Sequence, residues 1–164
     1  GCKTANQCGI HRWLRETADE NKLTLYDPYR PGIDWPERIE INREGMNADW
    51  LLTGANAITK VGEIVNLDGM GNRVAGISFG PSRVLIVVGT NKVVDNLHSA
   101  IDRVRNVAAP LNSKKLKFGN PCEVDGKCHD CSLPKRICRV WGIVEGQMEP
   151  GRMTVLLVEE DLGM

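Results

Sequence analysis

The chain has 164 residues, of which 41% are hydrophobic, and its 21 Lys and Arg residues balance 21 Asp and Glu residues. This composition is typical of a single globular domain and excludes collagen-like, coiled-coil and disordered chains. Without a basic excess, and with only 5% aromatic residues, the chain is not expected to bind nucleic acid. Its longest apolar run, 84–88, is far shorter than the ~20 residues of a membrane span, so none is expected.

The first third of the chain is predicted to be mostly helical. An amphipathic pattern predicts a short helix over 10–21, and loose alternation predicts a strand over 22–26. Asp34 can cap a second helix that begins at Trp35, with a proline in its first turn. Gly45 or Asn47 would end this helix.

Strands and helices alternate in the middle of the chain. Short strands are predicted over 49–52 and 62–67, and a short helix over 71–79. The β-branched run 83–88 is typical of a strand buried on both faces of a parallel sheet.

Apolar residues three and four positions apart predict a longer helix from Val94 to Ala108, stopped by Pro110. Two more strands are predicted over 140–144 and 153–159. The alternation indicates an α/β layered domain with a largely parallel sheet.

Three polar, glycine-rich loops follow predicted strands: 53–56, 68–73 and 89–92. Ligands of α/β sheets bind beyond the carboxyl ends of strands, so these loops are expected to share one crevice. Glycines let backbone amides approach an anion, to which Arg73 and Lys92 would add positive charge.

The acidic residues of this region, Glu63 and Asp68, are candidates for a general acid, a general base or a nucleophile. An alternative explanation is that Gly69 and Gly71 only form a tight turn, in which Asp68 or Asn72 bonds to its own loop. The segment matches neither the Gly-x-Gly-x-x-Gly fingerprint nor the P-loop, so neither NAD nor ATP is expected.

Four of the six cysteines follow the pattern C-x5-C-x2-C-x6-C: Cys122, Cys128, Cys131 and Cys138. In a chain without a secretion signal, such a cluster indicates metal ligands and the reducing cytoplasm. Thiolates select an iron–sulfur cluster or zinc. The compact spacing favours iron–sulfur slightly, and His129 could replace one ligand. Packed reduced thiols, adventitious disulfides and a redox sensor are the alternatives.

Four stretches, in this order, resemble the lactate-utilization (LUD) domain family and its cysteine-bearing subgroup: LTGANAITKVGEIVNLDGMGNRVAGISFGPSRVLIVVGTNKVV, APLNSKKL, PCEVDGKCHDCSLPKRICR and PGRMTVLLVEEDLGM. The resemblance implies a Rossmann-like three-layer α/β domain with a mostly parallel sheet, similar to the sugar-isomerase and CoA-transferase superfamily. It also implies a link to bacterial L-lactate oxidation beside iron–sulfur subunits.

The resemblance also assigns residues. The family's polar signature falls on Asn56, Glu63, Asn66, Asp68, Gly69, Gly71, Asn72, Arg73, Asn91 and Lys92. The subgroup's cysteines match the four named above. Family members usually carry a longer N-terminal part, so the chain is expected to be one LUD-like domain, 1–164, that lacks that part and contains a cysteine-rich loop, 118–140.

Three functions are compatible with these features. The chain could be an accessory of iron–sulfur lactate oxidation, with a pocket for a small anionic metabolite and iron–sulfur subunits as partners. It could instead be a stand-alone metabolite-binding enzyme or sensor with a structural zinc loop. A third hypothesis is that the chain is a structural module whose metal loop holds the C-terminal strands in place. A homodimer is one option for its assembly.

Overall fold

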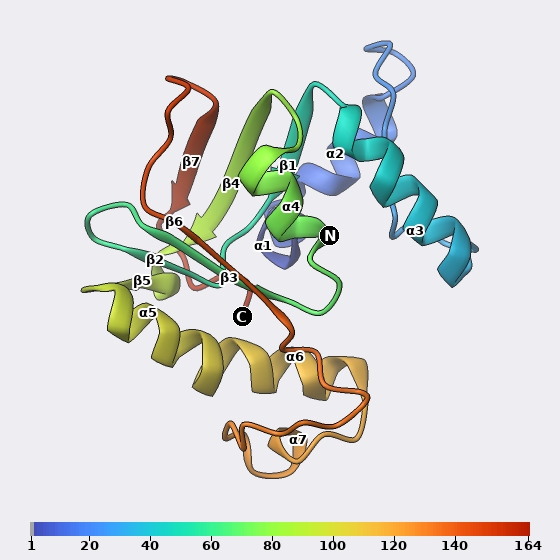
Figure 1. Ribbon diagram of the computed structural model, residues 1–164. Helices are drawn as coiled ribbons and strands as arrows, with labels where there is room; N and C mark the ends of the chain where they lie inside the picture. The colour runs from blue at the N-terminus through green and yellow to red at the C-terminus, as the bar shows by residue number, and fades with distance from the viewer. Residues whose placement is uncertain (1) are drawn as a thin grey trace.

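The computed structural model describes residues 2–164 and contains two β-sheets (Figure 1). Sheet A has three parallel strands in the order β1–β4–β7: β1 is Trp50–Thr53, β4 is Arg83–Gly89 and β7 is Met153–Val158. The α/β class and the parallel sheet predicted from the sequence are therefore confirmed.

Sheet B has the order β5–β2–β3–β6 and is mixed. Its strands are β2 (Ala57–Thr59), β3 (Ile64–Asp68), β5 (Val93–Val94) and β6 (Val140–Val144). The pairs β2–β3 and β3–β6 are antiparallel, whereas β2–β5 is parallel. The sequence did not predict this second sheet, because β2 and β5 are too short to show a period of two.

Three helices precede the sheets: α1 (Lys3–Gln7), α2 (Ile10–Thr17) and α3 (Trp35–Glu44). The Asp34 side chain caps α3 as predicted, accepting a hydrogen bond from the amide three residues later. The strand predicted over 22–26 is wrong. That segment is an irregular connection, and none of the described strands pairs with it.

One long helical stretch follows β5. It runs through α5 (Leu97–Arg103), a π-helical turn (Val104–Ala108) and α6 (Ala109–Leu116). The predicted stop at Pro110 is wrong, because the proline lies in the first turn of α6, directly after the π-helical turn. An imino nitrogen that cannot donate a hydrogen bond is tolerated at such a position.

Four short elements complete the chain: a 3₁₀ turn over Gly45–Asn47, α4 (Asn72–Phe79), a 3₁₀ turn over Thr90–Lys92, and α7 (Cys122–Asp125). Helix α4 contacts β1 of sheet A and also β3 and β6 of sheet B, so it bridges the two sheets. Helix α7 packs against α6 and lies at the bottom of the view in Figure 1.

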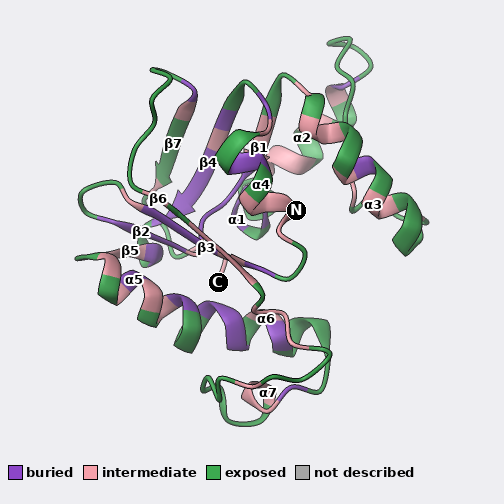
Figure 2. Ribbon diagram, in the orientation of Figure 1, coloured by how far each residue is buried: buried purple, intermediate pink, exposed green. Residues whose placement is uncertain are grey.

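The main hydrophobic core lies between the two sheets, and β4 runs through its centre (Figure 2). Val84, Ile86 and Val88 of β4 are fully buried there, while Val87 packs on the other face against Cys2. Each fully buried aliphatic side chain stabilises the fold by about 1.5–3 kcal/mol. The sequence prediction that this strand is buried on both faces is confirmed.

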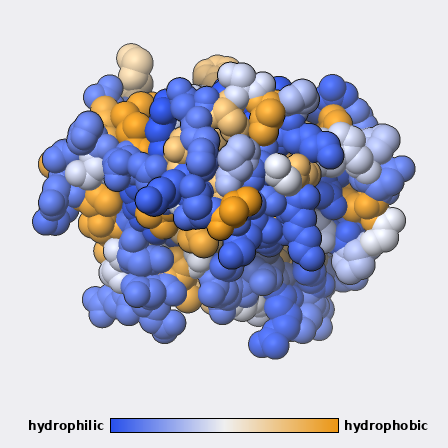
Figure 3. Space-filling model, turned by 90° about the horizontal axis from the view of Figure 1, so that it is seen from below, coloured by the Kyte–Doolittle hydropathy of each residue, from blue (hydrophilic) through white to orange (hydrophobic). Residues whose placement is uncertain are grey.

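A smaller core lies between sheet B and α5, where Val65 and Ala57 meet Ala100 and Val104. The lower face of the molecule is mostly hydrophilic, with hydrophobic side chains in separate groups (Figure 3). Within residues 2–164, none of the helices combines the length and the apolar character that crossing a membrane requires.

Candidate functional site

The carboxyl ends of β1 and β4 bring two of the three predicted loops together. These strands are parallel neighbours, so the loops 53–56 and 89–92 leave sheet A at the same edge. The Nζ atom of Lys92 lies 3.2 Å from the carbonyl oxygen of Ala55. The third loop follows β3 of sheet B and joins them through Arg73, whose Nη2 donates to Asn56 Oδ1 at 2.8 Å.

Asp68 and Arg73 form a bidentate ion pair within this region. Asp68 Oδ1 accepts hydrogen bonds from Nε and Nη2 of Arg73 at 2.8 and 2.6 Å. Its other oxygen accepts from the backbone amide of Val74 at 2.8 Å, in the first turn of α4. Asp68 therefore occupies the place that an anionic ligand would take at this helix, and it balances the charge of Arg73.

Two of the four asparagines of the polar signature, Asn56 and Asn66, hold the same loops in place. Asn56 Oδ1 accepts a second hydrogen bond, from the amide of Leu67 at 2.9 Å, and Asn66 Oδ1 accepts from the amide of Asn56 at 3.1 Å. Gly69 and Gly71 form the turn that leads into α4. Gly71 has a φ of +84°, which favours glycine.

Three further predicted residues lie elsewhere or act differently. Glu63 is in the turn between β2 and β3, at the opposite end of β3 from Asp68. Asn72 donates to the side chain of Asn42 on α3 at 2.9 Å and therefore ties α4 to α3. Asn91 Oδ1 accepts from the backbone amide of Leu162 at 3.3 Å.

Lys92 is the most buried cation of the predicted set, with only 4% of its surface exposed. Its Nζ also donates to Thr4 Oγ1 at 3.0 Å. Across residues 2–164, no carboxylate lies within ion-pair distance of it. Burial, together with the positive charges of Arg103, Arg73 and Lys3, lowers the pKa of Lys92 to about 8, whereas a thiolate at Cys2 would raise it.

Arg103 of α5 belongs to the same region and was missed from the sequence. Its Nη1 donates to the carbonyl oxygen of Asn56 at 2.6 Å and its Nε to that of Asn91 at 3.1 Å. Burial lowers the pKa of its guanidinium group. One signal was available, because Arg103 directly precedes the buried Val104 in the apolar stripe of the helix.

The C-terminal segment, 159–164, covers these two cations. Gly163 donates to the side chain of Gln7 at 2.7 Å, and the carbonyl oxygen of Met164 accepts from Arg103 at 3.3 Å. Gly163 packs so closely against the Lys92 ammonium group that a Cβ would have no room. The segment therefore closes the edge of sheet A above Lys92 and Arg103.

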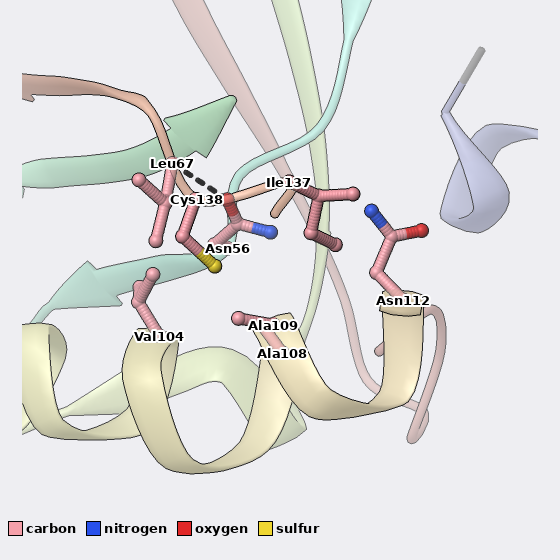
Figure 4. A pocket seen from close by; sticks show the side chains of 8 residues that line it. All are labelled: Asn56, Leu67, Val104, Ala108, Ala109, Asn112, Ile137 and Cys138. Atoms are coloured by element: carbon pink, nitrogen blue, oxygen red, sulfur yellow. Dashed lines mark hydrogen bonds between the residues drawn. The ribbon is translucent and has the colours of Figure 1, made fainter. Parts of the chain in front are cut away.

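Two cavities lie elsewhere, and neither is lined by these cations. One, of about 10 Å³, lies between the helical stretch and sheet B, where Asn56 and Cys138 point into it (Figure 4). It has room for one water molecule at most. The other, of about 310 Å³, lies at the β6–β7 connection and is lined by Glu145 and Glu149. Acidic walls do not suit an anion.

The cysteine-rich loop is held to α6 by a polar network. Glu123 Oε1 accepts from the Ser113 hydroxyl at 2.7 Å and from the Asn120 amide at 3.0 Å. The Asn120 side chain donates to Ser113 at 2.8 Å and also to the carbonyl oxygen of Lys135 at 3.3 Å. The first part of the loop is therefore fixed to α6, and Asn120 links it to Lys135 farther along the loop.

The four thiols of this loop lie near one another but do not surround a common metal position. Burial, together with negative charge on Cys128, Cys122 and Cys131, raises the pKa of Cys138 to about 11. Within the described part of the chain, no three potential ligands lie close enough together to hold a metal ion. The residue types fit a thiolate-bound centre, whereas the present side-chain arrangement does not enclose one.

A comparison with protein families gives one match. The family model described as "LUD domain" covers residues 1–158. No curated protein and no solved structure matches the chain significantly.

Proposed function

The chain belongs to the LUD domain family, which is the lactate-utilization family, and on this premise we propose that it is an accessory protein of bacterial lactate oxidation. In this proposal it binds a small organic anion between Lys92 and Arg103, and its cysteine-rich loop carries an iron–sulfur cluster. The pocket is displaced from the one expected from the sequence, because Asp68 already balances Arg73.

The observation that carries the proposal is that the described residues supply no side-chain carboxylate to the buried Lys92 or to the half-buried Arg103. Lys92 donates only to neutral oxygen atoms, whereas Arg103 donates to two backbone carbonyl oxygens and to the backbone oxygen of the last residue, Met164. An uncompensated charge in a protein interior costs several kcal/mol. A bound carboxylate would offset this cost, so the edge of sheet A is suited to an anion.

Arg152 shows how a purely structural buried cation differs. It is 7% exposed and donates to the carbonyl oxygens of Gly76 and Ile77 at the end of α4. These groups form the negative end of a helix dipole, which compensates the charge. Lys92 instead contacts a loop carbonyl and a hydroxyl group, without such compensation.

The geometry favours a small carboxylate in particular. Arg103 uses Nε and Nη1 for backbone carbonyls, and Nη2 makes no hydrogen bond with the described residues. A carboxylate oxygen could replace the Met164 carbonyl on Nη1 while the other oxygen binds Nη2. Such two-point contacts are the preferred geometry between arginine and carboxylates.

The cysteine-rich loop would supply the redox link to iron–sulfur partner subunits. Cys122, Cys128, Cys131 and Cys138 are its four thiols, and a metal centre would remove the mutual repulsion of their thiolates. A cluster held there would accept and donate electrons. All six cysteines are free in this structure, so the four of the loop are available as ligands.

Thermal unfolding with added L-lactate and pyruvate tests the anion pocket. The wild-type protein should unfold at a higher temperature with either compound, because each carboxylate binds only the folded state. Arg103→Gln and Lys92→Met should lose this shift, while Lys60→Met, on the exposed Lys60–Asp95 pair, should keep it. Full stabilisation of Arg103→Gln would show that the pocket is misplaced.

Anaerobic reconstitution with iron and sulfide, or with zinc, tests the loop. The proposal predicts bound iron and a visible absorption band, both lost in Cys131→Ser and kept in Cys8→Ser, since Cys8 is exposed and lies outside the loop. Stoichiometric zinc without iron binding would reject the iron–sulfur assignment. Binding of neither metal would reject the metal loop.

A further inference from the structure

We propose that Lys92 is a nucleophile that forms a Schiff base with a small carboxylate bearing an adjacent carbonyl group, the class of 2-oxo acids. The inference rests on the proposed anion pocket and names the substrate class of that pocket. It follows from how the amine and the neighbouring guanidinium group are held.

The surroundings of the Lys92 amine suit its neutral form. A neutral amine has two N–H bonds and one lone pair. Two acceptors are present, Thr4 Oγ1 at 3.0 Å and the Ala55 carbonyl oxygen at 3.2 Å. The amine also adjoins Gly163 of the C-terminal segment, a group that offers no acceptor side chain. Two hydrogen bonds therefore satisfy the N–H groups and leave the lone pair available.

The charged groups around Lys92 favour the same form. Arg103 of α5, Arg73 of α4 and Lys3 of α1 all act against protonation in addition to burial, and a thiolate at Cys2 would be the one opposing group. With a pKa of about 8, about a tenth of the amine is neutral at pH 7. Desolvation of this kind activates lysines that attack carbonyl carbons.

The spacing of the two cations selects the substrate class. Lys92 Nζ donates to the carbonyl group of Ala55, and Arg103 Nη1 donates to that of the next residue, Asn56. The two heads are therefore held by consecutive carbonyl groups of one loop. The charge of Arg103 also acts on the Lys92 amine, so the two heads lie near each other. In a 2-oxo acid the carbonyl carbon is bonded directly to the carboxylate carbon, so such a molecule carries, side by side, the two groups that these heads would bind.

The covalent step balances without an added oxidant or reductant. The amine nitrogen attacks the carbonyl carbon, and the carbonyl oxygen takes up a proton. The resulting carbinolamine loses its hydroxyl group as water, and a carbon–nitrogen double bond forms. The Thr4 hydroxyl, hydrogen-bonded to Nζ, is placed to relay a proton from the nitrogen to the leaving oxygen.

Entry of the substrate requires the C-terminal segment to move. Its contacts around the site are hydrogen bonds of Leu162, Gly163 and Met164 with Asn91, Gln7 and Arg103, at 3.3, 2.7 and 3.3 Å. Such bonds each contribute about 1 kcal/mol. A carboxylate on Arg103 replaces one of them directly.

Reductive trapping tests the proposal. The wild-type protein is incubated at pH 8 with pyruvate and sodium cyanoborohydride, and the adduct is located by peptide mass spectrometry. One pyruvate adduct on Lys92 is expected. Arg103→Gln should reduce labelling by pyruvate at least tenfold and labelling by acetone much less, since acetone has no carboxylate and loses only the effect of Arg103 on the protonation of Lys92. Labelling of the exposed Lys114 to the same extent as Lys92 would overturn the inference.

Two controls separate this inference from the pocket on which it rests. Lys92→Arg keeps the charge and should give no adduct; if it does not fold, protection of the wild-type protein by excess L-lactate serves instead. L-lactate has a hydroxyl in place of the ketone group of pyruvate and should bind without forming an adduct. Stabilisation by L-lactate and pyruvate without an adduct on Lys92 would refute the Schiff base and leave the pocket standing. Neither stabilisation nor an adduct would refute both.

Discussion

We expect Lys92 to make the stability of the protein depend on pH above about pH 8. Lys92→Met should remove this dependence. The pKa of Lys92 is lowered from 10.5 to about 8 by burial. Below pH 8 both the folded and the unfolded states hold the proton, and the cost of burying the charge is fully present. Between pH 8 and 10.5 the unfolded state binds more protons, so the free energy of unfolding rises with pH.

The size of this effect follows from the same values. A pKa difference of one unit corresponds to about 1.4 kcal/mol, so the full change amounts to about 3 kcal/mol. Between pH 7.5 and 9.5 we expect about 2 kcal/mol of it. Lys92→Met should lack this gain. Between these two pH values, the free energy of unfolding of the wild-type protein should therefore rise by about 2 kcal/mol more than that of the variant.

Urea denaturation at pH 7.5 and pH 9.5 measures the difference between the two proteins. Other groups titrate in this range, and their contributions cancel because both proteins contain them. Lys60→Met is the matched control: a hydrogen bond with Asp95 raises the pKa of the exposed Lys60, so its effect should not change between these two pH values. An equal pH dependence in wild-type protein and Lys92→Met would refute the account of a desolvated amine.

Further substitutions test the structural roles of the neighbouring residues. Asp68→Asn should lower the free energy of unfolding by about 3 kcal/mol, because it leaves Arg73 without its partner, whereas Glu63→Gln in the β2–β3 turn should change it by less than ~0.5 kcal/mol. Equal effects in urea denaturation would contradict the buried ion pair. Gly71→Ala should cost more than Gly62→Ala. Both positions have positive φ, but a Cβ at Gly71 would also press against Val140 at 3.3 Å, whereas Gly62 faces open space. The two thermal unfolding curves should therefore differ, and identical curves would count against this contact.

The local pattern of the sequence predicted much of the fold. The continuous run of β4, the cap at Asp34 and the strand β6 each depend on a few neighbouring residues, and the structure confirms them. The errors concern long-range effects. The helix passes Pro110 because a π-helical turn precedes it, and the segment 22–26 is no strand because no other strand pairs with it.

The candidate site could be predicted only in part, because its side-chain contacts are also long-range. Loops that follow the parallel neighbours β1 and β4 share one edge, so Asn56 and Lys92 could be grouped from the sequence, whereas Arg73 follows β3 of sheet B and joins them through its contact with Asn56. Which carboxylate balances which cation depends on side-chain directions that spacing does not encode. The pairing of Arg73 with Asp68, and the approach of Arg103 from α5, therefore required the structure.

A crystal structure of the protein grown with pyruvate tests the central claim most directly. The account predicts electron density for the carboxylate on Arg103 and continuous density from the carbonyl carbon to Lys92, with residues 162–164 moved away. Density for pyruvate at another place, with residues 162–164 still seated over Lys92, would contradict it.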